Sequence, residues 1–192
     1  MTLVLSSGPA VEPVTLADAK AQLRVDGTAD DTLIASLILT SRLHVEAGLG
    51  VALNTQSWSY FLDAWPPGAQ VVLPLRPVQS VAAVRLYADD ESVQTVPAET
   101  YLLDLDQQRP RLVRRGATVW PVPSRSANGI EIAMVAGYGD NAADVPAPIR
   151  QAILLLTAHW YDHRSPFEVG TVAAPVPPMV SELLAPYRAV RL

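Results

Sequence analysis

Two histidines at the end of an apolar stretch are the residues best spaced for chemistry. The segment AILLLTAHWYDHR, residues 152–164, carries His159 and His163 four positions apart, with Asp162 between them. On a helix, side chains at i and i+4 share a face, so both imidazoles could reach one metal ion. The H-x-x-D-H pattern is one methylene away from the H-x-x-E-H pattern of inverted zinc peptidases. A hydrolase would need a further ligand, and His44 is the remaining histidine.

A structural interpretation explains the same histidines without a metal. Trp160 and Tyr161 lie between them, and such amphipathic groups are typical of a buried helix that emerges into water. Histidine near a helix C-terminus is also favoured by the helix dipole. We therefore expect no metal, no cofactor and no catalytic residue here, and regard His159 and His163 as candidate contacts between subunits.

The densest positive cluster consists of Arg109, Arg111, Arg114 and Arg115. Arg111 and Arg115 share strand parity, whereas Arg114 faces the other way. Two interpretations stay open for this cluster. It either binds an acidic surface of a neighbouring subunit or forms a solvated edge that discourages aggregation.

Other polar groups that could do chemistry lack the required pattern. Asp104 and Asp106 alternate along one predicted strand, and residues 89–91 form an acidic turn, but the spacing of a calcium loop is absent. The sequence GYGD, residues 137–140, lacks the lysine and the remaining glycine of a phosphate loop. We expect solvated carboxylates in the first two cases and a turn after a strand in the third.

Composition bounds the class of protein. The chain has 192 residues, 49% of them apolar, which suffices for a real core. It contains no cysteine, so disulfides and thiol chemistry are excluded. The longest apolar run is far too short for a membrane span, which needs about 20 residues. The net charge of −5 does not favour strong binding of nucleic acid.

Three helices are predicted, two before and one after a β region. The first opens with Thr15 as N-cap and Asp18 three positions later, a capping-box pair, and is expected to stop at Gly27. The second covers residues 29–50, and the third, over 146–164, is apolar nearly all round and is therefore the expected centre of the helical part. One track along the second helix is expected to contain Leu33, Leu37, Thr40, Ser41 and His44.

Between these helices, residues 55–138 contain short runs of β-branched and aromatic residues separated by turn residues. The expected strands lie in SWSYFLD, QVVLPL, SVAAVRLYA, ETYLLDLD, PRLVRRG and GIEIAMVAGY. This spacing predicts a small antiparallel sandwich or barrel. The fold class is therefore α+β, a small helical bundle of three main helices with an inserted antiparallel β subdomain and an extended C-terminal tail.

The predicted boundaries are 1–54 for the N-terminal helical part, 55–140 for the β subdomain, 141–170 for the core helix and 171–192 for the tail. The tail begins with a proline-rich linker and then carries Leu183, Leu184, Tyr187, Val190 and Leu192. Because an exposed apolar run is costly, this segment must dock either on its own domain or on another chain.

Several segments together resemble the head–tail connector (adaptor) proteins of long-tailed bacteriophages. They are VTLADAKAQLRVD with DDTLIASLILTSRLHVE, then LPLRPVQSV, then AGYG with VPAPIRQAILLLTAHWYDHR, and finally LLAPYR. The resemblance covers most of the chain, while residues 89–126 match only in general character. The bias toward arginine, with Lys20 as the single lysine, makes a gene transfer agent a candidate origin.

The resemblance implies a structural protein of the virion and not an enzyme. Such proteins form a ring, usually of twelve copies, under the capsid portal, where they extend the DNA channel and dock the stopper or tail terminator. DNA passes without sequence recognition, no membrane is involved, and assembly takes place in the bacterial cytoplasm. An acidic chain suits such a channel because negative walls repel phosphate. The residues that would contact the portal are Leu183, Leu184, Pro186, Tyr187, Arg188, Val190, Arg191 and Leu192.

Two alternatives remain beside the connector hypothesis. One is a metal-dependent hydrolase that uses His159, His163 and His44. The other is a host- or carbohydrate-binding tail module, in which the β subdomain is the active part.

Overall fold

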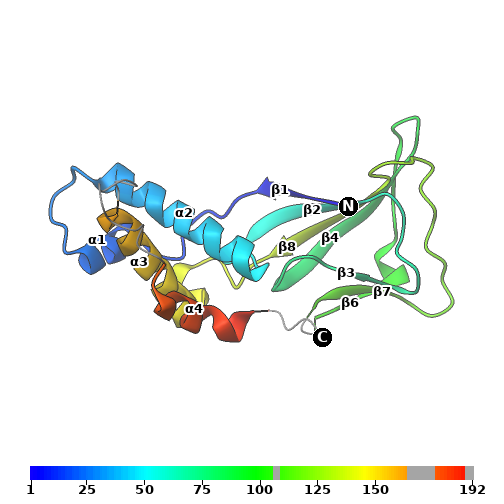
Figure 1. Ribbon diagram of the computed structural model, residues 1–192. Helices are drawn as coiled ribbons and strands as arrows, with labels where there is room; N and C mark the ends of the chain where they lie inside the picture. Colours follow the sequence, from blue (N-terminus) through cyan, green and yellow to red (C-terminus); the bar gives the residue numbers. More distant parts are fainter. Residues whose placement is uncertain (106–108, 164–175, 189–192) are drawn as a thin grey trace, which may run out of the picture. The chain divides into compact units, whose positions relative to one another are not determined.

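The computed structural model describes residues 1–105, 109–163 and 176–188, which form two compact units (Figure 1). The β unit contains residues 1–10 and 50–138. The helical unit contains residues 11–49 and the described residues from 139 onward. Helices and antiparallel sheets in this arrangement confirm the predicted α+β class, with a β subdomain inserted between helical segments.

The β unit holds two antiparallel sheets. The larger has the order β1-β2-β8-β4-β5, with strands at Thr2–Ser7, Gln56–Leu62, Ile130–Ala136, Val78–Tyr87 and Val93–Thr95. The smaller has the order β3-β7-β6, with strands at Gln70–Val72, Arg111–Arg114 and Tyr101–Asp104. A 3-10 turn, η1 (Ala98–Thr100), precedes β6.

Strand β8 is the central strand of the larger sheet, and one of its two faces is fully buried. Ile130, Ile132 and Met134 point to one face and are at most 1% exposed. Ile132 lies opposite Tyr60 of β2 and Val84 of β4. The same core includes Val71 of β3 and Leu112 of β7, so both sheets contribute to one apolar cluster. Burial of these branched side chains is the main stabilising term of the unit, at about 1.5–3 kcal/mol each.

Gly137, directly after β8, is a position where only glycine fits. Its φ is +137°, and a Cβ atom there would lie 2.5 Å from the carbonyl carbon of Asn54. The close approach is held by the hydrogen bond from the Tyr138 amide to the Leu53 carbonyl, 2.7 Å long. The glycine-containing segment is thus a turn that leaves the sheet, as the sequence predicted.

The helical unit contains α1 (Leu16–Leu23), α2 (Asp31–Leu49), α3 (Ala147–Asp162) and α4 (Pro178–Leu184), with 3-10 turns η2 (Ala142–Asp144) and η3 (Ala185–Tyr187). The predicted capping box of α1 is confirmed: the Thr15 Oγ1 accepts from the Asp18 amide at 3.0 Å, and Asp18 accepts from the Thr15 amide at 3.1 Å. Such a cap stabilises a helix by about 1 kcal/mol. The helix ends at Arg24, which adopts the left-handed conformation, and so stops before the predicted Gly27.

Helix α3 is the centre of the helical unit, as predicted, and packs against α1, α2 and α4. Its residues Ile149, Ile153 and Leu156 are fully buried. A buried hydrogen bond of 3.0 Å joins the hydroxyls of Thr157 and Ser41, linking α3 to α2. A buried hydroxyl that lacks a hydrogen-bond partner would be costly in this apolar setting. The pair therefore fixes the register of the two helices.

Two assignments made from the sequence differ from the structure. Residues 1–10, assigned to the helical part, contribute β1, which pairs with β2, and residues 50–54 also belong to the β unit. The buried face of α2 runs through Ile34, Ile38 and Val45, whereas Leu33 and Leu37 are only half-buried. The error in α2 arose because leucines flank the true track on both sides and mask its period.

Candidate assembly surfaces

The three histidines lie in the helical unit but do not converge. His44 of α2 contacts the Trp160 ring edge-to-face, with ring centroids 5.7 Å apart. His159 and His163 lie side by side, with centroids 4.6 Å apart, and the Nδ1 of His163 is 2.8 Å from the carbonyl oxygen of His159. The pair of His159 and His163 therefore caps the C-terminal end of α3, as expected for histidines at a helix C-terminus.

The geometry gives no support to the metal-dependent hydrolase. Within the described ranges, no group of three or more His, Asp or Glu side chains is placed to hold a metal ion. Asp162 is exposed at the end of α3. The arrangement is a polar, partly exposed helix end.

The C-terminal segment docks on its own unit. Helix α4 presents Val180 and Leu184, one turn apart, toward α3, and they are 3% and 8% exposed. Prolines at the start of α4 supply its first turn, and Pro186 lies in η3, where the α-helix has ended. The predicted extended tail is therefore a short helix over residues 178–184, because Val180 and Leu184 gain more by burial than by remaining extended.

The candidate portal residues are divided by this docking. Leu184 is buried, Leu183 and Tyr187 are half-buried, and Pro186 and Arg188 are exposed. Val190, Arg191 and Leu192 lie outside the described residues. Among the candidate portal residues that the structure describes, the exposed ones are therefore Pro186 and Arg188.

The four arginines of the cluster differ in burial and in their partners. The Nε of Arg111 donates to Asp104 at 2.8 Å, and its Nη1 donates to the Gln70 side chain at 2.7 Å. Arg114 is half-buried, whereas Arg109 and Arg115 are exposed. Arg111 is thus committed to the smaller sheet, because Asp104 lies opposite it in the strand register. Asp106, which was predicted to alternate with Asp104 along one strand, lies outside the described residues.

A buried carboxylate on the second face of the larger sheet escaped the sequence analysis. Glu131 of β8 accepts from the hydroxyls of Ser59 and Tyr87, both at 2.6 Å, and from Arg85 at 3.1 Å. Burial alone would raise the pKa of Glu131, but the hydrogen bonds from Ser59, Tyr87 and Arg85 outweigh it, and the pKa is lowered. The hydrogen bond to Glu131 in turn raises the pKa of Tyr87.

The outward face of α2 is a second feature that sequence reasoning missed. We call it the α2 ridge, and it consists of Thr32, Ser36, Leu39, Leu43 and Ala47, all exposed and all uncharged. Leu39 and Leu43 are 42% and 50% exposed and lie one turn apart. The charged residues of α2 are engaged elsewhere: Arg42 and Glu46 pair in the interior, and Asp31 pairs with Lys20. An exposed helix face without charge is typical of an interface.

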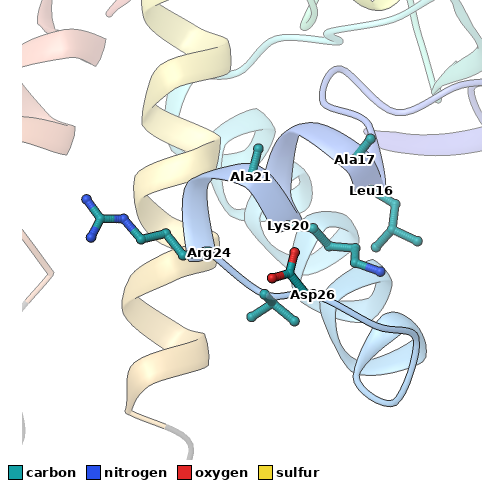
Figure 2. Close-up of a pocket in the computed structure, with 7 residues that line it drawn as sticks. Leu16, Ala17, Lys20, Ala21, Arg24 and Asp26 are labelled. Carbon is teal, nitrogen blue, oxygen red and sulfur yellow. The ribbon is translucent and has the colours of Figure 1, made fainter.

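A groove lies along the exposed side of α1 (Figure 2). It has a volume of about 790 Å³ and is lined by Leu16, Ala17, Lys20, Ala21, Arg24, Val25 and Asp26. We call it the α1 groove. Its lining combines apolar residues with Lys20, Arg24 and Asp26, which carry both charge signs. None of the helices in the described parts of the chain is long and apolar enough to cross a bilayer.

Comparison with known proteins identifies similar chains only among solved structures. No family model matches the sequence, and no curated protein matches it. A chain from the neck of an empty gene transfer agent particle, computed with C6 symmetry, is 27% identical, with a TM-score of 0.87, and the match covers 100% of this chain and 97% of the other.

Two further structures give the same result. A chain from the virion of a native gene transfer agent particle is 27% identical, with a TM-score of 0.84 and coverage of 100% and 97%. A chain from the neck of a native particle, computed with C12 symmetry, is 28% identical, with a TM-score of 0.76 and coverage of 98% and 97%. This chain is therefore similar, over essentially its whole length, to proteins that build the neck of gene transfer agent particles.

Proposed function

We propose that this chain is a structural head–tail adaptor that forms a ring in the neck of a gene transfer agent or related phage-like particle. The observation that carries the proposal is the full-length match to a neck chain at a TM-score of 0.87. Because both units and their connections are included in that match, the likeness extends beyond a common subdomain.

A ring of this kind would lie beneath the portal, extend the DNA channel and dock the stopper or tail. Solved necks with C6 and C12 symmetry support a closed arrangement of repeated copies, and twelve copies is the stoichiometry that we propose. The net charge of −5 is compatible with DNA that slides past without sticking. The role is structural, and no observation favours the hydrolase or the carbohydrate-binding module over it.

Loss of the chain tests this function directly. Particle-producing cells that lack the chain should accumulate heads that carry portals but no tails, as seen by electron microscopy. Re-expression of the chain should restore complete particles. Complete, tailed particles in the absence of the chain would contradict an adaptor role.

The accessible end of the tail is the proposed contact with the portal. Arg188 is exposed beside Pro186, and arginine is enriched at interface hot spots. Arg188→Glu should leave the helical unit folded and weaken association with portal rings about tenfold or more, because it reverses the charge at the contact. Co-sedimentation with portal rings measures the effect, and Glu182→Lys, an exposed change on α4 itself, is the control. Equal binding by Arg188→Glu and wild type would show that this end of the tail is not part of the interface with the portal.

A further inference from the structure

The α2 ridge and the α1 groove are two different faces of the helical unit. The ridge residues point away from the buried track of α2, which faces α1 and α3. The groove residues lie on the side of α1 away from buried Ala19, and Figure 2 shows them on the near side of α1, with α2 passing behind it. The α2 ridge projects leucine side chains, the α1 groove is a hollow, and both belong to the helical unit.

We propose that the α2 ridge of one copy docks in the α1 groove of the next copy. This inference rests on the ring of the proposed function and names the surfaces that close it. A contact between two different faces of a subunit is head-to-tail, and such contacts close into a ring when the rotation between copies closes. Leu39 and Leu43 would contact Leu16, Ala17 and Ala21 of the groove lining.

Charge also fits this pairing and sets its direction. Lys20 is committed within its own chain to Asp31 and to the Gly27 carbonyl oxygen, whereas Arg24 is exposed and has no ion-pair partner among the described residues. The last turn of α2 contains no basic residue, and a cation near a helix C-terminus is favoured by the helix dipole. Placing α2 parallel to α1 of the neighbour brings this end to Arg24. The uncharged ridge brings no ion that the groove would have to desolvate.

The absence of native cysteine makes the pairing testable by disulfide trapping. Ala21 and Leu43 are both exposed, so the double variant Ala21→Cys/Leu43→Cys should fold. In particles that carry this variant, mild oxidation should produce a ladder of dimer, trimer and larger species on a non-reducing gel. Each single variant should stay unlinked. The matched control, Ala143→Cys/Leu43→Cys, uses an exposed position away from the groove and should give no ladder.

Other outcomes overturn the inference in distinguishable ways. If electron microscopy shows a ring but oxidation gives no ladder of crosslinked species, the ridge-and-groove contact is refuted and the proposed function still stands. Dimers of the single Leu43→Cys variant would show that the ridge pairs with itself, and a link to a different neck protein would show another occupant. Absence of the chain from the neck overturns the proposed function and this inference together.

A second variant tests the same contact without a crosslink. Leu43→Glu should lower the assembled fraction about tenfold or more, because it places an unpaired carboxylate in an apolar contact. Adding Ala21→Arg in the same chain should restore part of the assembly. Assembly of Leu43→Glu at the level of wild type would contradict the proposal.

Discussion

At the scale of single residues, Glu131 connects neighbouring strands of the larger sheet. Its carboxylate accepts from Ser59 of β2 and from Arg85 and Tyr87 of β4, and Ser59 lies 3.2 Å from the hydroxyl of Ser6 in β1. The network therefore spans four adjacent strands. A buried carboxylate with every partner in place specifies register, because a slip of one residue would leave it unpaired.

Glu131→Gln removes the charge from this network and leaves its shape unchanged. We expect the free energy of unfolding to fall by about 1–3 kcal/mol, because three charge-assisted hydrogen bonds are weakened. Urea denaturation followed by circular dichroism measures the change. Glu99→Gln, at an exposed position, is the control and should be neutral. A neutral result for Glu131→Gln would mean that the network adds nothing to stability.

The pH dependence of stability provides a separate test of the same carboxylate. The pKa of Glu131 lies below its ordinary value of 4.5 in the folded state. A lowered carboxyl pKa stabilises the fold at pH values above the unfolded pKa, and this contribution is lost as the pH falls through the folded pKa. The stability difference between wild type and Glu131→Gln should therefore be complete above 4.5 and shrink below it. A difference that is constant across this range would contradict the assignment.

At the scale of elements, the hydroxyl pair between α2 and α3 fixes their packing. Thr157→Val should cost about 1–2 kcal/mol, because the Ser41 hydroxyl would be buried without its partner. The double variant Ser41→Ala/Thr157→Val should cost less than the sum of the two single changes. Thermal unfolding of the four proteins measures this coupling. Strict additivity would show that the two hydroxyls act independently.

The docking of α4 on α3 depends on the side chains of Val180 and Leu184. Leu184 is the one that we choose for the test. Leu184→Ala should weaken the packing of α4 on α3 by about 2–3 kcal/mol, through loss of apolar contact. Hydrogen exchange should then show reduced protection of the α4 amides while α2 and α3 stay protected. Glu182→Ala, exposed on the same helix, is the control. Unchanged protection in Leu184→Ala would show that α4 is held by other contacts.

Prediction from sequence succeeded where a local signal was strong. The Thr15–Asp18 cap, the apolar run of α3 and the run of β-branched residues in β8 each carry their own physical signature. It missed β1 and β5, because six and three residues give little periodicity and a strand is confirmed only by its partner. The buried Glu131 was also missed, since a charged residue in a strand is normally exposed and only the register brings Ser59, Arg85 and Tyr87 to it.

At the scale of the whole molecule, the surfaces that we propose for assembly lie in the helical unit, while the β unit holds an extensive apolar cluster. In the proposed ring the uncharged α2 ridge would be buried, which would account for exposed leucines on a helix whose Arg42 and Glu46 pair in the interior. Ring contacts between weakly interacting copies need a template, so the isolated chain is expected to be monomeric and to assemble on the portal.

The most direct test of the neck-ring account is electron cryomicroscopy of particles that carry this chain. The account predicts a closed ring of identical copies between portal and tail, with α2 of each copy against α1 of the next. A neck in which this density is occupied by another protein, or in which the chain is present as a single copy, would contradict it.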